Sequence, residues 1–252
     1  MKRLIAVLAV LALAGCGGAD GGSADGPVTG TVTVFAAASL TDVFTSLGDE
    51  LEQRNPGLDV QFNFAGSSQL ATQITQGAPA DVFASANEKQ MQVVTDAGLQ
   101  AADPTIFSEN VLEIAVPRGN PGHVTGLADF GKADLTIAVC APAVPCGAAA
   151  QQVFAAAGVA AKPDTQEQDV KAALTKVSLG EVDAALVYQT DVRAAGDTVQ
   201  GIEFPEAQDA VNTYPITALK AAANPAAAKA FVALVLSPTG RQALTTAGFR
   251  AP

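Results

Sequence analysis

Hydrophobic residues along this chain follow two alternating patterns. Short runs that are apolar throughout, or that alternate with polar residues, predict strands, whereas apolar residues three and four positions apart predict helices. The strands are expected at 31–36, 59–65, 80–86, 111–119, 135–140, 182–188 and 212–220. The helices are expected at 39–55, 67–77, 87–98 with Asn87 as its N-cap, 146–158, 169–180 and twice between 225 and 248. This alternation indicates an α/β protein whose mainly parallel sheets are covered by helices on both faces.

The first sixteen residues have the pattern of an export signal. Lys2 and Arg3 precede an apolar run that is short for a membrane-spanning helix, and small residues and Cys16 follow it. The segment "LAGC" that ends at Cys16 resembles the lipobox of bacterial lipoproteins, so we expect residues 1–15 to be removed and Cys16 to carry a lipid anchor on the outer side of the cell membrane. The alternative is a soluble secreted protein in which Cys16 is a free thiol. Residues 17–27 are rich in glycine and polar residues, which is typical of a flexible tether.

Charge and length limit the classes of function. The sequence contains 14 Lys and Arg against 25 Asp and Glu, a formal net charge of −11. Loss of Lys2 and Arg3 with the signal leaves 12 basic residues against 25 acidic ones, and the net charge becomes −13. Nucleic acid is therefore not expected as a partner, because phosphate binding needs clustered Lys and Arg. The remaining chain, residues 28–252, is long enough for one large or two small lobes.

Four of the predicted helices begin with small, polar or uncharged residues. They begin at Ser39, at "GSS" 66–68, at "PCG" 145–147 and at residues 169–170. The first N–H groups of a helix have no partner within it and carry partial positive charge, so a helix start is a natural anion site. In open α/β sheets such starts converge at the carboxyl ends of the strands. The alternative at each position is an ordinary N-cap, and Ser39 with Asp42 fits a capping box.

Several motifs occur together, in order, along the chain from Thr31 to Phe249. They are "VFAAASLTDVF", "FNFAGSSQLATQITQGAPADVFASAN", "VPCG", "DVKAAL" and "AALVY". In these motifs the chain resembles the periplasmic molybdate-binding proteins of ABC importers, which have the type II periplasmic binding protein fold. The resemblance implies two lobes, each a mainly parallel sheet flanked by helices, with a ligand cleft between them. It also implies capture of molybdate or tungstate for delivery to an ABC permease in the cytoplasmic membrane.

The same resemblance implies which residues hold the oxyanion. In that family, uncharged donors alone bind the ion. The implied set is the hydroxyl and N–H of Ser39 and Ser67, the backbone N–H of Cys146 and Val170, and the hydroxyl of Tyr188. For Tyr188 the alternative is a ring packed on the surface of a lobe with its hydroxyl in water. The cysteine in "VPCG" stands where many relatives have a small residue, and a backbone donor tolerates that change.

Two cysteines remain besides Cys16. A short segment containing two prolines separates Cys140 from Cys146, and an exported protein meets an oxidising compartment. We therefore expect a disulfide between them in preference to two free thiols, with a contribution on the order of 2 kcal/mol. A zinc or redox site is not expected, because His123 is the only histidine in the sequence.

The chain order also predicts how the donors are divided. Lobe one is expected to contain residues 28–110 and 216–252, and lobe two residues 111–215. Two of the donors then lie on lobe one and three on lobe two, so an ion between the lobes favours the closed form. Because a chain with a charge of −13 repels a dianion at long range, binding is expected to depend on fixed short-range donors. Tungstate should fit as molybdate does, sulfate is smaller, and phosphate often carries a proton that a cage of donors cannot receive.

Other functions are disfavoured rather than excluded by the sequence. The cleft can instead fit sulfate or another oxyanion. A further alternative is an organic solute. A binding site for an amino acid usually has an arginine for the carboxylate and an acidic residue for the amine, and Arg54, Arg118, Arg193 and Arg241 all lie outside the helix-start motifs. An iron-binding site would need neighbouring tyrosines, and Tyr188 is far from Tyr214 in the sequence.

Two further classes predict different chemistry. An anchored extracytoplasmic enzyme is disfavoured because the sequence has neither "GxSxG" nor "HExxH" and offers only His123 for a Ser–His pair. A structural lipoprotein would bind no small ion. We therefore expect a monomeric binding protein with no catalytic residues and no resident cofactor.

Overall fold

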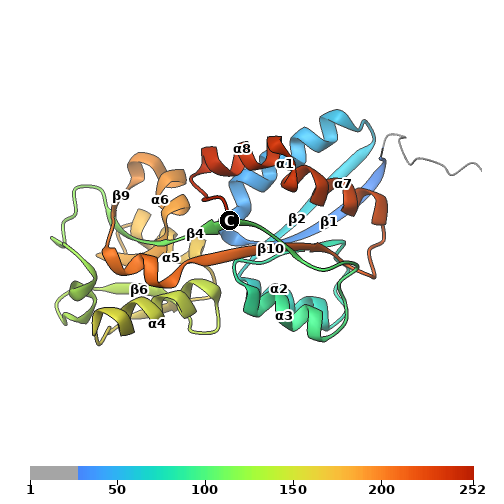
Figure 1. Ribbon diagram of the computed structural model, residues 1–252. Coiled ribbons are helices and arrows are strands. Elements are labelled where there is room, and N and C mark those ends of the chain that lie inside the picture. The colour runs from blue at the N-terminus through green and yellow to red at the C-terminus, as the bar shows by residue number, and fades with distance from the viewer. Residues whose placement is uncertain (1–27) are drawn as a thin grey trace, which may run out of the picture.

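The structure, a computed structural model, describes residues 28–252, so the expected signal, the lipidated Cys16 and the tether lie outside the described residues. Residues 28–252 form two lobes placed side by side, each built on one five-stranded sheet (Figure 1). Helices cover both faces of each sheet, which confirms the expected two-lobed α/β fold class. Within the described part of the chain, no helix is both long enough and apolar enough to cross a membrane.

The first sheet lies in the lobe that contains both ends of the described chain. Its strand order is β2-β1-β3-β10-β4, with β1 parallel to β2 and β3, and β10 antiparallel to β3 and β4. The strands are β1 Gly30–Ala37, β2 Leu58–Ala65, β3 Val82–Ala84, β4 Thr105–Asn110 and β10 Asn212–Ala218. One face is covered by α1 Thr41–Arg54, α7 Pro225–Leu236 and α8 Pro238–Ala247, and the other by α2 Ser67–Thr75 and α3 Glu88–Asp96 (Figure 1).

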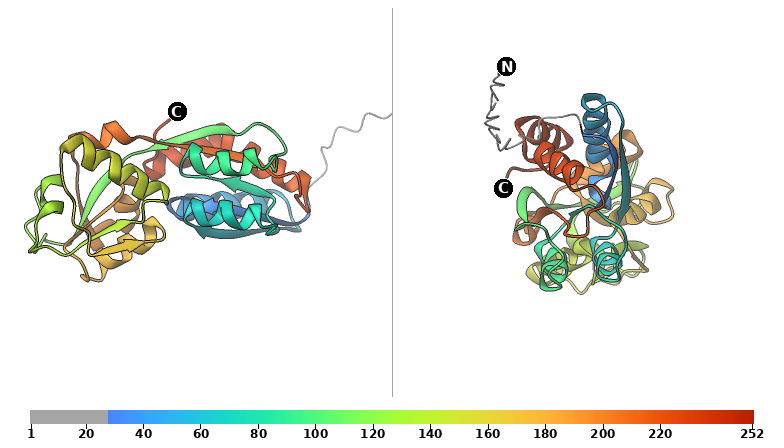
Figure 2. Two further views of the ribbon diagram at one scale, coloured as in Figure 1. Left: turned by 90° about the horizontal axis from the view of Figure 1, so that it is seen from below. Right: turned by 90° about the vertical axis from the view of Figure 1, so that its right-hand side faces the viewer.

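The second sheet repeats this arrangement with different strands. Its order is β7-β6-β8-β5-β9, with β6 parallel to β7 and β8, and β5 antiparallel to β8 and β9. The strands are β5 Leu112–Pro117, β6 Ile137–Cys140, β7 Thr165–Glu167, β8 Ala184–Tyr188 and β9 Val199–Ile202. The helices are α4 Pro145–Ala157, α5 Val170–Ser178 and α6 Gln189–Ala195, with short 3-10 helices η2 Leu127–Gly131, η3 Gly196–Thr198 and η4 Pro205–Ala210. Helix α4 lies on one side of this sheet and α5 on the other (Figure 2).

The sequence pattern did not predict β4, β7 and β9. All three are edge strands, and they are less buried than the central strands, so they lack the continuous apolar run that marks those strands in the sequence. Two of the four strand pairings in each sheet are antiparallel, where a mainly parallel sheet was expected, because β10 and β5 each run antiparallel to both of their neighbours. The expected N-cap of α3 is confirmed, because the Asn87 side chain accepts a hydrogen bond from the Gln90 N–H.

The chain crosses between the lobes twice, each time over a single residue. Val111 alone separates β4 from β5, and Val211 alone separates η4 from β10. The expected return after residue 215 is therefore corrected to Val211, because β10 already pairs with β4 of the first sheet at Asn212. Strands β4 and β10, which carry these crossings, run side by side along the middle of the molecule (Figure 1). Two such short connections allow the lobes to move as separate bodies about a hinge.

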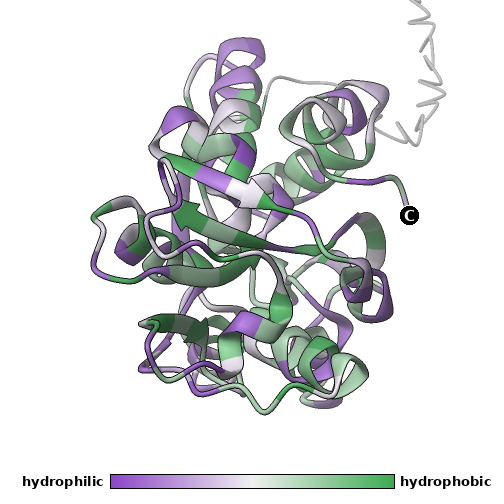
Figure 3. Ribbon diagram, turned by 90° about the vertical axis from the view of Figure 1, so that its left-hand side faces the viewer, coloured by the Kyte–Doolittle hydropathy of each residue, from purple (hydrophilic) through white to green (hydrophobic). Residues whose placement is uncertain are grey.

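Each lobe has its own hydrophobic core. In lobe one, Val32 and Val34 of β1 pack against α1, α7 and α8, while Phe35 faces α2 and α3 on the opposite side. In lobe two, one continuous cluster surrounds Ile114 and Leu186 of the central strands. Hydrophobic residues accordingly follow the inner strands, and hydrophilic residues gather on the outer helices and loops (Figure 3). Residues 28–252 thus bury both sheets within themselves, as an independently folding unit requires.

A disulfide joins Cys140, the last residue of β6, to Cys146 in the first turn of α4. The two Cα atoms are 5.7 Å apart, within the range that a disulfide spans. Gly147 follows directly, and a Cβ there would lie 2.0 Å from the carbonyl oxygen of Ala141. The disulfide and the close packing at Gly147 together fix the start of α4 against the carboxyl end of β6.

Glu113 of β5 is a buried carboxyl group without an ion pair among the described residues. It lies against Gly201 of β9, where an added Cβ would be 1.8 Å from the Glu113 Oε1. Burial and then repulsion from Glu203 raise the pKa of Glu113 from 4.5 to about 7. Because the folded state holds this proton more tightly than the unfolded chain, the stability it contributes is complete below pH 4.5 and is lost as pH rises through about 7.

Replacing this carboxyl group should therefore change the pH dependence of stability. Glu113→Gln keeps a neutral side chain at every pH, so the variant should match the wild type at about pH 5 and exceed its unfolding midpoint at about pH 8. After allowance for partial solvent access, the gain is on the order of 1 kcal/mol, about 2–4 °C. Thermal unfolding followed by circular dichroism measures it. Glu203→Gln, which removes only the repulsion, should give a smaller gain of the same sign, whereas an equal difference at both pH values would contradict the assignment.

Candidate functional site

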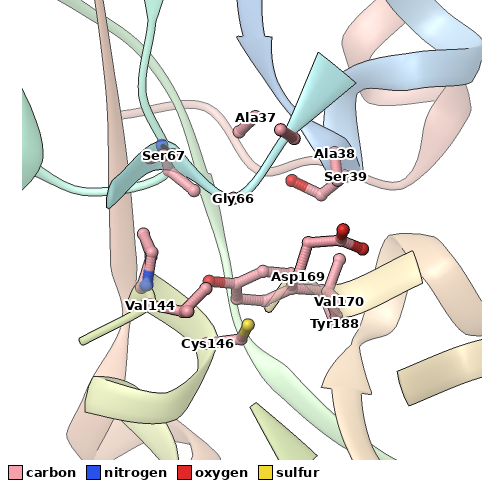
Figure 4. A pocket seen from close by; sticks show the side chains of 13 residues that line it. Ala37, Ala38, Ser39, Gly66, Ser67, Val144, Cys146, Asp169, Val170 and Tyr188 are labelled. Atoms are coloured by element: carbon pink, nitrogen blue, oxygen red, sulfur yellow. Dashed lines mark hydrogen bonds between the residues drawn. The ribbon is translucent and has the colours of Figure 1, made fainter. Parts of the chain in front are cut away.

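A pocket lies where the two lobes meet. It is lined by Ala37, Ala38, Ser39, Ala65, Gly66, Ser67, Ala86, Val144, Pro145, Cys146, Asp169, Val170 and Tyr188. The space between them, including the part open to solvent, is about 200 Å³. In Figure 4 the residues of lobe one face those of lobe two across this space. The structure thus brings together all five residues that the resemblance assigns to the oxyanion.

Ser39 and Ser67 lie at helix starts, but neither caps its helix. Ser39 belongs to the 3-10 turn η1 (Ala38–Leu40) between β1 and α1, and its Oγ is 3.0 Å from the hydroxyl oxygen of Tyr214. Ser67 is the first residue of α2, and its Oγ accepts a hydrogen bond of 3.0 Å from the Ala86 N–H. The alternative of an ordinary N-cap is therefore wrong for both serines. Since the Ser67 oxygen acts as an acceptor in that bond, its own proton is free to be donated into the pocket.

Lobe two supplies backbone donors from two helix starts. Pro145 occupies the first position of α4 and has no N–H, so the N–H of the buried Cys146 is the first donor of this helix. Asp169 is the N-cap of α5, and its side chain accepts a hydrogen bond of 2.9 Å from the Ala172 N–H. The N–H of Val170, at the first position of α5, has no partner within the helix. Both free N–H groups belong to residues of the pocket wall.

Tyr188 ends β8 and projects its ring into the space between the lobes (Figure 4). The residue is 1% exposed, so the alternative of a surface ring with its hydroxyl in water is wrong. Its hydroxyl has no partner with hydrogen-bond geometry among the described residues, although the hydroxyl of Tyr214 approaches it. Burial raises the pKa of Tyr188 well above its usual value of 10, which keeps the group protonated and able to donate. A buried hydroxyl without a partner costs about 1–3 kcal/mol of free energy, and a bound acceptor would recover this cost.

Tyr214 of β10 contacts two residues of the pocket wall, Ser39 and Tyr188, and the sequence did not predict this role. Its ring centroid lies 6.2 Å from that of Tyr188, although 26 positions and a lobe crossing separate the two residues in the chain. The inference that these tyrosines are far apart is therefore wrong in space. An iron site is still not favoured, because iron is bound by phenolate oxygens and burial raises the pKa of both tyrosines. Among residues 28–252 there is also no group of three or more His, Cys, Asp or Glu placed to hold a metal ion.

The pocket contains no positively charged side chain. Of the residues that line it, only Asp169 is charged, and one of its oxygens is already occupied by the start of α5. No arginine lines the pocket, so the bidentate fork that usually binds an organic carboxylate is missing there. His123, in the loop after β5, is also absent from it, which leaves no Ser–His pair in the pocket. The arrangement can hold a small anion by uncharged donors from both lobes.

Gly66 shows that the lobes touch across the pocket. A Cβ at this position would lie 2.2 Å from the carbonyl oxygen of Gln168, which belongs to the opposite lobe. Nearby, the Gln90 side-chain amide of α3 donates a hydrogen bond of 3.1 Å to the carbonyl oxygen of Ala143 in lobe two. The structure is therefore that of a closed form. The resemblance did not assign a role to Gly66, although a glycine directly before a helix start is a signal of close backbone approach.

Comparison with known proteins gives the same picture. The family model for bacterial extracellular solute-binding proteins matches residues 32–250. The molybdate-binding protein ModA of Mycobacterium tuberculosis is 43% identical over 252 residues, which cover 99% of this chain and 97% of the relative. The molybdate-binding protein ModA of Haemophilus influenzae is 30% identical over 264 residues, covering 100% of both chains. Among solved structures, the periplasmic molybdate-binding protein of Azotobacter vinelandii aligns with a TM-score of 0.75 and 20% identity, over 88% of this chain and 99% of that chain.

The sequence match and the fold agree along nearly the whole described chain. The matched residues include both sheets except the first two residues of β1, both crossings and every residue of the pocket wall. The family consists of binding proteins rather than enzymes, which confirms the expectation that the chain is not an enzyme. The chain belongs to the bacterial extracellular solute-binding proteins.

Proposed function

We propose that this protein captures molybdate, and tungstate with it, as the binding component of an ABC importer. The observation that carries the proposal is the buried Tyr188 hydroxyl, which lines a pocket of uncharged donors and has no partner among the described residues. An oxyanion supplies acceptor oxygens without needing a proton from the protein. The two relatives named molybdate-binding proteins, which align over nearly their full lengths, support the choice of ion.

The proposed ligand contacts divide between the lobes. Ser39 and Ser67 donate from lobe one through their hydroxyl and N–H groups. Cys146 and Val170 donate their backbone N–H groups from lobe two, and Tyr188 donates its hydroxyl. An ion that accepts from both sides interacts with more donors in the closed form than in the open form, so its binding stabilises closure. The disulfide at Cys146 supports the proposal by fixing the turn that presents one of these donors.

Uncharged donors at fixed positions also provide selectivity. A tetrahedral ion that is too small leaves some of the buried donors unpaired, and each such loss costs about 1–3 kcal/mol. Sulfate should therefore bind less tightly than molybdate, and tungstate, which has a similar size and charge, should bind comparably. Phosphate near neutral pH often carries a proton, for which the only charged acceptor in the pocket wall is the already hydrogen-bonded Asp169 carboxylate.

The place of action follows from the N-terminal segment and the family. We infer that Cys16 carries a lipid after removal of residues 1–15 and that residues 17–27 tether the two lobes to the outer side of the membrane. The protein then acts as a monomer, needs no cofactor, and passes the ion to a permease that recognises the closed form. The family of extracellular solute-binding proteins supports this location.

A thermal-shift series tests the ligand. Ligand-free protein comprising residues 28–252 is titrated with molybdate, tungstate, sulfate and phosphate. At about one hundred times its dissociation constant, a ligand adds about 2.7 kcal/mol, which should raise the midpoint by roughly 5–10 °C. We expect shifts of this size with molybdate and tungstate. A shift with sulfate alone would make the protein a sulfate-binding one, and no shift with any of the four ions would contradict oxyanion capture.

Tyr188→Phe separates ligand binding from folding. The change removes a hydroxyl that has no partner in the structure, so the ligand-free variant should be as stable as the wild type or slightly more stable. Its affinity for molybdate should fall by about tenfold or more, because one donor is lost. Isothermal titration calorimetry and ligand-free thermal unfolding measure the two quantities. Tyr214→Phe is the control: it removes the partner of Ser39 and should lower the ligand-free midpoint. Unchanged molybdate affinity in Tyr188→Phe would contradict the assignment.

Gly66→Ala tests whether binding requires the closed form. The added methyl group would meet the Gln168 carbonyl oxygen of the other lobe, so it should obstruct closure while each lobe stays folded. We expect the molybdate affinity to fall at least tenfold, with little change in the ligand-free unfolding midpoint. The matched control is Gly126→Ala, because a Cβ at Gly126 meets no atom within 4 Å. Wild-type affinity in Gly66→Ala would show that closure is not needed.

A further inference from the structure

The contacts between the lobes fall into two groups. At the hinge, the Asn110 side-chain amide donates a hydrogen bond of 2.8 Å to the hydroxyl of Thr190, directly beside the crossing at Val111. Away from the hinge, two polar contacts join helices of lobe one to lobe two. Gln90 of α3 reaches the Ala143 carbonyl, and Asp42 of α1 reaches a lysine of α5. Helices α1 and α3 cover opposite faces of the first sheet, so these two contacts hold the closed form from both sides (Figure 1).

The lysine in the second contact is Lys171, which is the neighbour of the proposed donor Val170. Its Nζ lies 2.9 Å from Oδ2 of Asp42 in lobe one and 3.5 Å from Oδ1 of Asp191 in its own lobe. Asp191 is completely buried, and its other oxygen accepts a hydrogen bond of 3.2 Å from the Tyr188 N–H. The ion pair between Lys171 and Asp191 lies within lobe two, so it does not depend on the position of lobe one.

Asp42 differs from Asp191 in exposure and in the lobe to which it belongs. Its side chain is 65% exposed and forms no other ion pair among the described residues. When the lobes separate, α1 moves away from α5, and Asp42 returns to water at little energetic loss. The bond between Lys171 and Asp42 can thus form only in the closed form.

We propose that Lys171 and Asp42 are positioning residues that form a closure latch, which slows release of the bound oxyanion without touching it. The latch rests on the proposed function, because its effect on release requires an ion in the pocket. Lys171 lies at the start of the same helix that presents the Val170 N–H, so a bond from Lys171 to α1 also holds this helix start against lobe one. Opening the cleft then requires this ion pair to break before the ion can leave.

The latch predicts that Asp42→Asn weakens the binding of molybdate, whereas the change in net charge alone predicts stronger binding. Asp42→Asn removes one negative charge from an acidic protein, which by itself would reduce repulsion and strengthen the binding of a dianion. Loss of the latch instead weakens binding. Because the ion pair is partly exposed, we expect a two- to fivefold faster dissociation of molybdate, and this difference should shrink as salt is raised from about 0.05 M to about 1 M.

Stopped-flow dissociation of molybdate from the protein comprising residues 28–252 provides the first test. The matched control is Asp49→Asn, which removes an exposed, unpaired carboxylate of the same helix. Asp49→Asn should leave the dissociation rate unchanged or slightly lower, and Asp42→Glu, which keeps the charge, should retain most of the wild-type behaviour. Equal dissociation rates in Asp42→Asn, Asp49→Asn and the wild type at low salt would overturn the latch.

A second test needs no ligand and so separates the latch from the proposed function. Spin labels at the exposed positions Gln92 of α3 and Gln152 of α4 report the distance between the lobes by pulsed electron paramagnetic resonance. In ligand-free protein, Asp42→Asn should reduce the population at short distance, and Asp49→Asn should not. If no protein variant binds molybdate, the proposed ligand fails and this distance measurement alone decides the latch. Identical distance distributions in all three proteins would overturn it.

Discussion

Backbone N–H groups at helix starts cannot be buried without a partner, and this constraint organises the structure. The starts of η1, α2, α4 and α5 all meet at one point between the lobes, where Ser39, Ser67, Cys146 and Val170 are each less than 10% exposed. The first turn of a helix has no acceptor of its own to offer these groups. In the closed form the described part of the chain offers no acceptor for these N–H groups, so a molecule from outside the chain must supply one. An anion is suited to this position because it also matches the positive ends of the helix dipoles.

Topology and small residues together make this convergence possible. Strands β1, β2 and β6 each lead from their carboxyl ends into one of these helix starts, as the alternation of strands and helices requires. The residues that line the cleft on lobe one include Ala37, Ala38 and Gly66. Because they are small, the backbones of the two lobes can approach each other across the cleft. On the other side, the disulfide at Cys146 and the tight packing of Gly147 limit how far the start of α4 can move. The donors are thus fixed within each lobe and only the distance between lobes varies.

The sequence predicted those parts of the structure that depend on local patterns. Helix starts and central strands carry their own signals in residue type and spacing, and the resemblance placed five residues that do meet in one pocket. The edge strands β4, β7 and β9 were missed because their pairing depends on a neighbour rather than on their own hydrophobicity. Ser39 followed by Asp42 has the local pattern of a capping box, but a buried tyrosine from a distant strand takes the serine hydroxyl instead. The proximity of Tyr188 to Tyr214 results from the second lobe crossing, which no local pattern encodes.

An acidic protein whose pocket contains no cation can select its anion through the lifetime of the bound state. Long-range repulsion from an acidic protein, with a formal net charge of −11 over the full sequence, slows the approach of every dianion to a similar degree, so it cannot distinguish one from another. Fixed donors act only at contact, and they retain an ion of the right size while a smaller one leaves some donors unpaired. A cation inside the pocket would raise the affinity for all anions and weaken this discrimination. Lys171 lies just outside the pocket wall with its charge compensated by Asp42 and Asp191, so it can act on the lobes rather than on the ion. Differences in affinity among oxyanions should accordingly appear mainly in their dissociation rates.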